Sequence, residues 1–146
     1  MSATREPGQR LVLRTDGASR GNPGPAAAGV VIEAEDGRVI ARGRRYLGIM
    51  TNNQAEYRAL ILGLKTIARY QPSAVTVYLD SELVVNQMTG RYNVRNEALR
   101  PLYDAACAVA QELPNVRFYH VPRAQNHLAD ALANAALDAQ REHASQ

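Results

Sequence analysis

Short apolar runs separated by turn residues dominate the first third of the chain. Three of these runs predict strands, at residues 11–15, 26–33 and 38–47. The Pro-Gly-Pro segment at 23–25 is expected to exclude regular structure, and Asp36-Gly37 is typical of a two-residue hairpin. The first third therefore predicts three consecutive antiparallel strands.

The chain changes to a helical period after Thr51. Thr51 and Gln54 fit a capping box, and apolar residues then recur every three or four positions. Further on, the pattern predicts a strand at 74–79, helices at 82–88 and 97–113, a strand at 116–121, a loop at 122–125, and a last helix to residue 140 that Asn126 caps. A strand–helix–strand arrangement with a crossover implies parallel pairing for the strand at 74–79.

Four acids stand at the ends of these predicted elements. Asp16 and Asp80 each follow a strand, Glu56 lies on the apolar stripe of the first long helix, and Asp130 lies one turn into the last helix. If the strands at 11–15 and 74–79 are parallel neighbours, Asp16 and Asp80 emerge together at one edge of the sheet. Glu56 and Asp130 are placed to close a ring around that edge.

Gathered carboxylates need a positive partner. Like charges about 5 Å apart repel by roughly 3 kcal/mol per pair at an effective dielectric constant of 20. Because the ring offers only oxygen ligands, it predicts Mg²⁺, with Mn²⁺ as a substitute, and a cluster of this kind supports two ions beside a phosphate.

Composition and charge narrow the class of protein. The chain has 146 residues, of which 46% are hydrophobic, and this size and composition predict one globular domain. We expect a disordered tail at 1–9, the domain at 10–140 and a frayed end at 141–146. No apolar stretch approaches the roughly 20 residues of a membrane span, and no secretory signal precedes the domain, so a cytoplasmic location is expected.

Cysteine and arginine usage add two further points. The single cysteine, Cys107, excludes an intramolecular disulfide and a thiolate metal cluster. The net charge is only +3, but 16 of the 17 basic residues are arginines, which suit forked contacts to phosphate. This composition favours a nucleic-acid partner modestly.

Four segments resemble, in order, the four catalytic signatures of type 1 ribonuclease H. They are Thr15-Asp16-Gly17-Ala18-Ser19-Arg20-Gly21-Asn22-Pro23-Gly24-Pro25, then Thr51-Asn52-Asn53 with Glu56, then Asp80-Ser81, and lastly Ala129-Asp130 with Leu132-Ala133. The resemblance spans residues 11–140. It implies an α/β, ribonuclease H-like fold, with a five-stranded mixed sheet (three antiparallel strands, then parallel ones) and helices on both faces. It also implies an endonuclease that cuts the RNA strand of RNA–DNA hybrids.

The same resemblance assigns roles to individual residues. Asp16, Glu56, Asp80 and Asp130 would be the catalytic residues and the ligands of two Mg²⁺ ions, with Asp16 shared between both. The side chains that match positions facing the minor groove of the hybrid are those of Asn22, Asn52, Asn53 and Gln54. Thr51 matches a position that holds a phosphate of the DNA strand. The expected products carry 5′-phosphate and 3′-hydroxyl ends, and the expected enzyme is a monomer that needs no protein partner and no membrane.

Two departures from the family pattern concern the loop before the last helix and the segment after residue 88. Many members carry a histidine in that loop, where this chain has none between Val121 and Asn126. Arg123 is one candidate to take its place as an auxiliary group, and His127 is another. Larger members also insert a basic helix and loop, of which only residues 89–96 remain here.

Three alternatives stay open at this point. The same fold also serves transposases, resolvases and exonucleases, although the Asn-Pro-Gly and Thr-Asn-Asn segments favour a hybrid substrate. A second alternative is a nucleic-acid-binding domain without catalysis, against which the four intact acids argue. A third is that the chain is one domain of a larger polypeptide.

Overall fold

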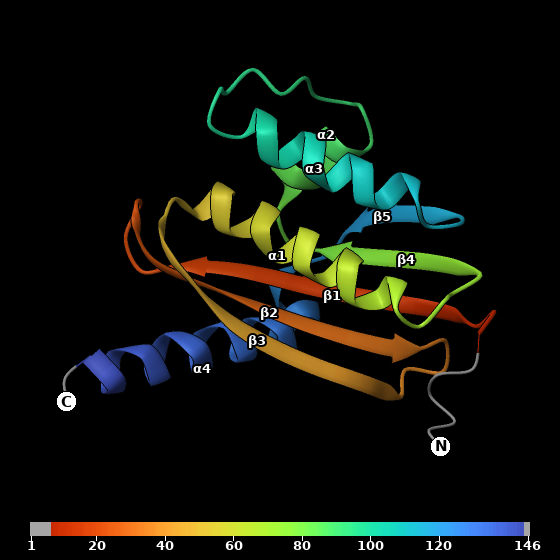
Figure 1. Ribbon diagram of the computed structural model, residues 1–146, viewed down its shortest axis with the longest axis horizontal. Helices are drawn as coiled ribbons and strands as arrows, with labels where there is room; N and C mark the ends of the chain where they lie inside the picture. The colour runs from red at the N-terminus through yellow and green to blue at the C-terminus, as the bar shows by residue number, and fades with distance from the viewer. Residues whose placement is uncertain (1–6, 145–146) are drawn as a thin grey trace.

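One mixed sheet of five strands organises the computed structural model, which describes residues 7–144 (Figure 1). The elements, in chain order, are β1 (Arg10–Ser19), β2 (Gly24–Ala34), β3 (Val39–Met50), α1 (Asn52–Ala68), β4 (Ala74–Leu79), α2 (Glu82–Met88), α3 (Arg100–Gln111), β5 (Val116–His120), the 3₁₀ helix η2 (Arg123–Asn126) and α4 (His127–Ala144). The strand order across the sheet is β3-β2-β1-β4-β5.

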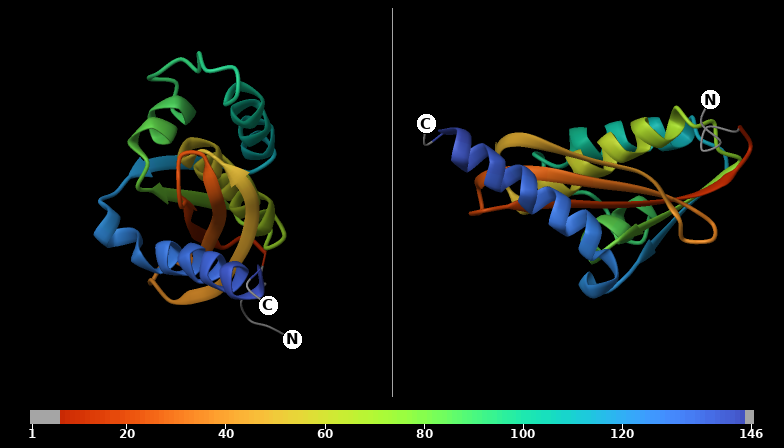
Figure 2. Two further views of the ribbon diagram at one scale, coloured as in Figure 1. Left: turned by 90° about the vertical axis from the view of Figure 1, so that its left-hand side faces the viewer. Right: turned by 90° about the horizontal axis from the view of Figure 1, so that it is seen from below.

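The pairing of the strands confirms the expected mixed sheet. β1 pairs with β2 and β2 with β3 in antiparallel fashion, whereas β1 with β4 and β4 with β5 are parallel. α1 packs on β1 and β2 and is covered by α3, while α4 packs on β1, β2 and β3 from the other side (Figures 1 and 2). Helices therefore cover both faces, as the family resemblance implied.

Three local predictions were wrong. Gly24 and Pro25 do not interrupt the sheet, because β2 begins at Gly24 and pairs there with Met50 of β3. The third helix begins at Arg100 rather than at residue 97, where Asn96 Oδ1 instead accepts hydrogen bonds from the next turn. The expected loop at 122–125 belongs largely to η2, and Asn126 is buried at its end, where Nδ2 donates to the Thr15 carbonyl at 2.9 Å.

The start of α1 follows the predicted capping box. The Gln54 backbone N–H donates to Thr51 Oγ1 at 3.2 Å, and the Thr51 backbone N–H donates to Gln54 Oε1 at 2.9 Å. Both contacts satisfy N–H groups that have no partner inside the helix. The capping box thus fixes where α1 begins, and with it the position of Glu56.

The described residues, 7–144, extend slightly beyond both boundaries of the predicted domain at 10–140. The expected disordered tail falls mainly on residues 1–6, outside that part. Just after it, the Gly8 N–H donates to the Gln71 carbonyl and the Ser73 N–H donates to the Gln9 carbonyl. α4 continues to Ala144, four residues past the predicted boundary, and residues 145–146 again lie outside the description. None of the helices within residues 7–144 has the length and apolar character that crossing a bilayer requires.

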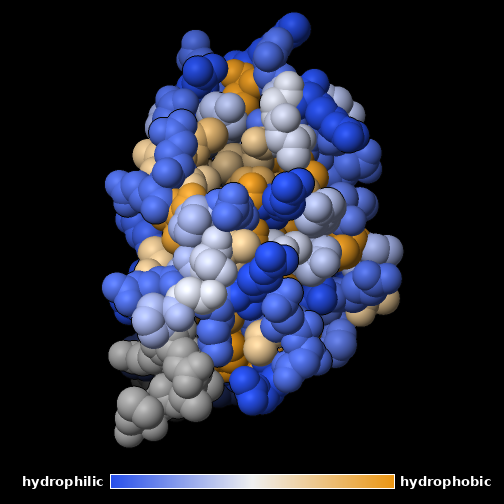
Figure 3. Space-filling view, turned by 90° about the vertical axis from the view of Figure 1, so that its right-hand side faces the viewer, coloured by the Kyte–Doolittle hydropathy of each residue, from blue (hydrophilic) through white to orange (hydrophobic). Residues whose placement is uncertain are grey.

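The hydrophobic core lies between the sheet and the layer formed by α1 and α3. β1 and β4 supply Leu11, Leu13, Val75 and Val77 to this core, and α1 supplies Leu60, Leu64 and Ile67. The end of the molecule that carries the amino ends of β1 and β4 is mainly hydrophilic, with only small hydrophobic areas (Figure 3). The carboxyl ends of the same strands carry the acids described below.

One buried hydrogen bond in this core allows a stability prediction. The Tyr57 hydroxyl donates to Gln87 Oε1 at 2.6 Å, and the exposed fractions of the two residues are 0% and 4%. Tyr57→Phe leaves the Gln87 oxygen buried without this donor, so we expect the free energy of unfolding to fall by about 1–2 kcal/mol. Urea denaturation measures the change, and Tyr92→Phe at a half-exposed site is the control that should leave stability unchanged.

Candidate active site

Three carboxylates meet at the carboxyl ends of β1 and β4. Asp16 lies inside β1, opposite Gly29 of β2, and so not just after the strand as predicted. Asp80 directly follows β4, and Glu56 lies in the first turns of α1. One carboxylate oxygen from each of the three residues lies within 4.8 Å of the others. The structure therefore brings these predicted acids together.

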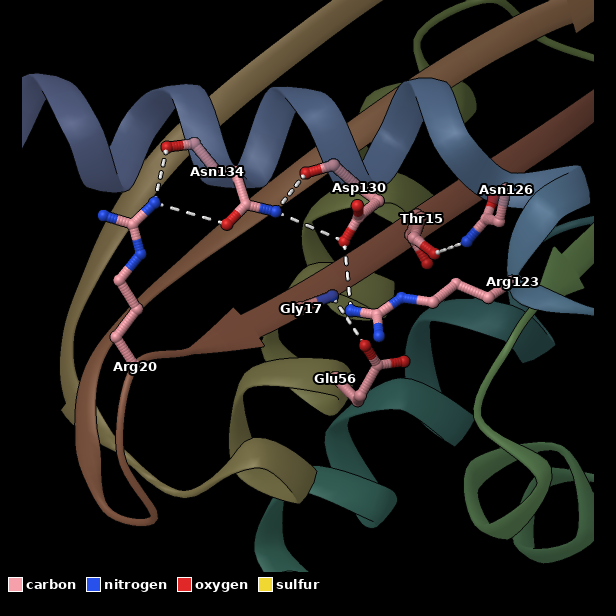
Figure 4. Close-up of polar contacts among 8 residues, drawn as sticks. All are labelled: Thr15, Gly17, Arg20, Glu56, Arg123, Asn126, Asp130 and Asn134. Atoms are coloured by element: carbon pink, nitrogen blue, oxygen red, sulfur yellow. Dashed lines mark hydrogen bonds and ion pairs between the residues drawn. The ribbon is translucent and has the colours of Figure 1, made fainter.

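A glycine lets α1 approach closely enough to place Glu56. A Cβ atom added to Gly17 would lie 2.2 Å from the carbonyl carbon of Ala55, a distance that no side chain tolerates. With glycine there, the Gly17 N–H donates to Glu56 Oε1 at 2.7 Å (Figure 4). This hydrogen bond holds the Glu56 carboxylate toward the end of β1, beside Asp16.

The fourth acid, Asp130, joins from α4 on the other side of the sheet. Burial is the main cause of the raised pKa of Asp16, and the nearby carboxyl group of Asp130 adds to it. α4 lies unusually close to β2, because a Cβ atom added to Gly29 would be 1.9 Å from the carbonyl oxygen of Ala129. Asp130 therefore lies at the same edge of the sheet, although only Asp16, Glu56 and Asp80 form the group with oxygens within 4.8 Å of one another. The four acids are here called the acidic cluster.

A chain of polar side chains orients Asp130 (Figure 4). Asn134 Nδ2 donates to the carbonyl oxygen of Asp130 at 3.0 Å and to its Oδ1 at 3.3 Å. Arg20 Nη2 in turn lies 3.3 Å from Asn134 Oδ1 and 2.7 Å from Asp138 Oδ1. The turn after β1 is thus tied to α4 through the residue that orients Asp130.

Burial sets the protonation of the cluster. Desolvation, followed by the charges of Glu56 and Asp80, raises the pKa of Asp16 to about 10. Burial also raises the pKa of Glu56 to about 7, against the lowering effect of the Gly17 N–H, and burial raises the pKa of Asp80. The charged forms are therefore unfavourable together without a cation.

The cluster fits a hard divalent cation. Asp16 Oδ2 is buried and has no hydrogen-bond partner among the described residues, although a carboxylate oxygen is a strong acceptor. The atoms around it that could bind a metal ion are carboxylate oxygens, the ligands that Mg²⁺ and Mn²⁺ prefer. A bound cation would supply the unpaired oxygen with a partner and would offset the raised pKa values of Asp16, Glu56 and Asp80.

The two auxiliary candidates are placed differently. Arg123 Nη2 lies 3.4 Å from Asp130 Oδ1, and the Arg123 side chain is 77% exposed. Its positive charge offsets part of the rise that burial causes in the pKa of Glu56 and in that of Asp80. His127 is exposed, and its Nδ1 lies 3.2 Å from the carbonyl oxygen of Ala124 in its own turn. Arg123 therefore faces the acidic cluster, whereas the observed contact of His127 is local.

The predicted substrate-binding residues gather beside α1. Asn22 Oδ1 accepts a hydrogen bond from the Asn52 N–H at 3.0 Å, which ties the turn after β1 to the first turn of α1. A hollow of about 190 Å³ lies next to this contact, lined by Asn22, Thr51, Asn53, Gln54, Asn96, Ala98 and Leu99. Asn52 and Asn53 are exposed, whereas Thr51 and Gln54 also serve the capping box.

Asn96 is the polar residue of this hollow that sequence reasoning missed. It comes from the segment between α2 and α3, which the sequence pattern indicated only as the remainder of a larger family insertion. In the sequence, Asn96 stands just before a predicted helix, and helix capping explains an asparagine there as well as substrate binding does. Only the packing of that segment against the start of α1 brings Asn96 to the hollow.

Comparison with known proteins identifies relatives over nearly the whole chain. Residues 14–136 match the protein family described as reverse transcriptase-like. A bifunctional protein of Mycobacterium tuberculosis is 43% identical over 93% of this chain, which covers 38% of that protein. Ribonuclease HI of Halobacterium salinarum is 44% identical over 90% of this chain and 66% of its own length. The chain thus spans about two fifths to two thirds of the length of these curated relatives.

Solved structures of RNase H proteins have the same fold as this chain. The N-terminal RNase H domain of the mycobacterial protein superimposes with a TM-score of 0.88 at 43% identity, covering 93% of this chain and 99% of that one. RNase H1 of Halobacterium salinarum gives a TM-score of 0.86, covering 88% and 98%. LC11-RNase H1, solved in complex with an RNA/DNA hybrid, is 40% identical with a TM-score of 0.86, covering 89% and 98%.

Proposed function

The chain belongs to the type 1 ribonuclease H family, and we propose that it is an endonuclease that hydrolyses the RNA strand of RNA–DNA hybrids. The observation that carries this proposal is the convergence of Asp16, Glu56 and Asp80, with carboxylate oxygens within 4.8 Å of one another. Each buried acid destabilises the fold unless a bound cation compensates its charge, and a domain that only binds nucleic acid does not need such a group of acids.

Two Mg²⁺ ions are the proposed cofactor, with Mn²⁺ as a substitute, held by Asp16, Glu56, Asp80 and Asp130. Asp16 is proposed as the shared ligand, because its carboxylate lies within 4.8 Å of those of Glu56 and Asp80 and carries the unpaired oxygen. Divalent ions held by these carboxylates would supply Lewis-acid chemistry for a water that attacks the scissile phosphorus and for the leaving 3′ oxygen, and the proposed products carry 5′-phosphate and 3′-hydroxyl ends.

Residues around the cluster orient it and meet the nucleic acid. The Gly17 N–H fixes the Glu56 carboxylate, and Asn134 fixes that of Asp130. Arg123, at the exposed rim, is placed to offset the negative charge of a phosphate that enters the site. His127 is the weaker auxiliary candidate because it is engaged with its own turn.

Recognition of the hybrid is assigned to the asparagine-lined hollow beside α1. An amide side chain both donates and accepts, as does the 2′-hydroxyl group that distinguishes RNA from DNA. Asn22, Asn52, Asn53 and Gln54 are proposed for the minor groove, and Thr51 for a phosphate of the DNA strand. Asn96 lines the same hollow and joins this set.

A panel of labelled substrates tests the proposed activity. Hybrid, duplex RNA and duplex DNA of one sequence are incubated with Mg²⁺ and either the wild-type protein or Asp80→Asn. We expect cleavage of the RNA strand in the hybrid alone, and loss of that cleavage in the variant. Cutting of duplex DNA in preference to the hybrid would support the transposase, resolvase or exonuclease alternatives instead.

The support of Asp130 by Asn134 gives a second test of the site. Asn134→Ala removes the hydrogen bonds to the Asp130 carboxylate and its link to Arg20. Residues that orient metal ligands typically contribute about 10-fold or more to activity or metal affinity. We expect the rate of hybrid cleavage to fall about 10-fold and the Mg²⁺ concentration for half-maximal rate to rise. Gln140→Ala, on the same helix, should change neither quantity.

A further inference from the structure

The part of the sheet formed by β1, β4 and β5 has a second face that takes no part in the core. Side chains alternate between faces along a strand, so the residues between Leu11, Leu13, Val75 and Val77 point away from α1. We call this surface the tyrosine face; its residues are Arg10, Val12, Arg14, Thr76, Tyr78, Arg117 and Tyr119. α4 covers β1, β2 and β3 on this side, and Arg117 and Tyr119 on the outer strand are exposed.

An arginine and two tyrosines form one row across three strands. Arg14 is the register partner of Tyr78, and Tyr78 is the register partner of Tyr119. The Arg14 guanidinium lies 4.6 Å from the centre of the Tyr78 ring, and the two tyrosine rings lie 5.9 Å apart at an angle of 35°. Tyr119, at the outer end of this row, is 46% exposed, although a tyrosine ring has much apolar surface to bury.

The neighbouring row is hollowed and carries more positive charge. Val12, Thr76 and Arg117 are register partners there. A hollow of about 440 Å³ lies over them, lined also by Arg10, Tyr78, Asn115 and Glu35. Arg14 is paired with Glu33 at 3.2 Å, and Glu35 lines the hollow with Arg10 and Arg117. A second hollow beside Tyr119 is lined by Glu82, Arg91 and His120, so exposed arginines stand next to the ring on both sides.

This combination suits a single strand of nucleic acid. Bases stack on exposed aromatic rings and on arginine planes, while further arginines contact the phosphates. A duplex offers no unstacked base to such a ring, whereas every base of a single strand has a free face.

The tyrosine face is also connected to the acidic cluster. Asp16 follows Arg14 by two residues on β1, and Asp80 follows Tyr78 by two residues, just past the end of β4. Arg14 Nη1 donates to the carbonyl oxygen of Gln125 at 3.0 Å, within the 3₁₀ turn that carries Arg123. A strand that leaves the cluster past Arg123 therefore meets this row next.

We propose that the tyrosine face binds a single-stranded extension of the nucleic acid held at the acidic cluster. The proposal rests on the proposed function in taking that nucleic acid to be an RNA–DNA hybrid. Binding itself rests on Tyr119 and Arg117 and requires neither divalent ions nor cleavage.

Fluorescence anisotropy with labelled 12-nucleotide strands of RNA and of DNA tests the binding, at low salt and with EDTA present. We expect Tyr119→Ala to weaken binding about fivefold or more, as the loss of one stacked base does. Tyr119→Phe keeps the ring and should bind like the wild type. Arg117→Ala should also weaken binding, whereas Arg141→Ala, which removes the same charge from the exposed end of α4, should not. Circular dichroism checks that each variant is folded.

Cleavage of two hybrids separates this proposal from the proposed function. The wild-type protein should show a lower KM for a hybrid with a single-stranded extension than for a blunt one, and Tyr119→Ala should remove the difference. Equal binding of single strands by the wild type, Tyr119→Ala and Arg117→Ala would overturn the proposal, as would self-association that depends on Tyr119. If single strands bind through Tyr119 but no hybrid is cleaved, the tyrosine face stands and the proposed function fails.

Discussion

Replacing Asp16 with asparagine is expected to lower the rate of hybrid cleavage by at least about 1,000-fold, equivalent to about 4 kcal/mol of transition-state stabilisation. Asp16 is the central member of the acidic cluster: its carboxylate lies within 4.8 Å of those of Glu56 and Asp80, and its buried Oδ2 has no hydrogen-bond partner among the described residues. Asparagine has nearly the same shape but no negative charge, so the variant loses its hold on the divalent ions while keeping the fold.

Initial rates at saturating hybrid and Mg²⁺ measure this effect. Asp36→Asn is the matched control, because Asp36 is an exposed hairpin residue that accepts a hydrogen bond from the Arg38 N–H. It should cleave like the wild type. An Asp16→Asn protein that retained a tenth of the wild-type rate would mean that the chemistry does not pass through this carboxylate.

The same variant should be more stable than the wild type when no metal is present. The pKa of Asp16 is raised from 3.8 to about 10, so its charged form is disfavoured in the folded protein. Stability of the metal-free wild type is therefore lost as the pH rises from about 4 toward 10, and a residue that cannot ionise escapes this loss. At pH 8 we expect a gain of about 1–3 kcal/mol for Asp16→Asn in EDTA. Thermal unfolding with and without Mg²⁺ should show stabilisation by the ion in the wild type only.

Gly29→Ala is expected to have the second-largest effect. The new Cβ atom would lie 1.9 Å from the Ala129 carbonyl oxygen and 2.9 Å from the Ala133 backbone nitrogen, and a backbone cannot yield as a flexible side chain does. α4 must move away from β2, which we expect to cost about 3 kcal/mol in the free energy of unfolding. Because Asp130 follows Ala129, hybrid cleavage should fall more than 10-fold in protein that remains folded.

Gly43→Ala is a close control for this substitution. Gly43 lies on β3, next to β2, and an added Cβ atom there meets nothing within 4 Å. It should leave both urea stability and cleavage close to the wild type, because alanine suits a strand slightly better than glycine. If the two glycine variants proved equally stable and equally active, the close approach of α4 would not be what places Asp130.

The sequence pattern predicted the architecture well because most elements follow local rules. The bounds of β4 and α2 were predicted at the observed residues, and the capping box located the start of α1. The acids were found because each conflicts with the apolar pattern around it, and a conflict of this kind is visible in one dimension. The prediction failed at Pro25. Proline usually interrupts a strand, but Pro25 is the second residue of β2, and its neighbours in the sequence do not indicate this.

What escaped prediction depends on contacts between distant segments. The seat of α4 on Gly29 depends on a helix a hundred residues further on, and nothing around Gly29 signals it. The role of Asn134 in orienting Asp130 depends on hydrogen bonds that the sequence does not show. Asn126 was predicted to cap the last helix, whereas its Nδ2 donates to the carbonyl oxygen of Thr15. The tyrosine face likewise exists only once β1, β4 and β5 are paired.

Analysis of the ends produced from a labelled RNA–DNA hybrid tests the central claim most directly. Cleavage by divalent ions held on Asp16, Glu56, Asp80 and Asp130 predicts RNA fragments with 5′-phosphate and 3′-hydroxyl ends, formed with Mg²⁺ and abolished by EDTA. Fragments that end in a 2′,3′-cyclic phosphate, or cleavage that persists in EDTA, would show that the 2′-hydroxyl attacks without metal and would contradict the account.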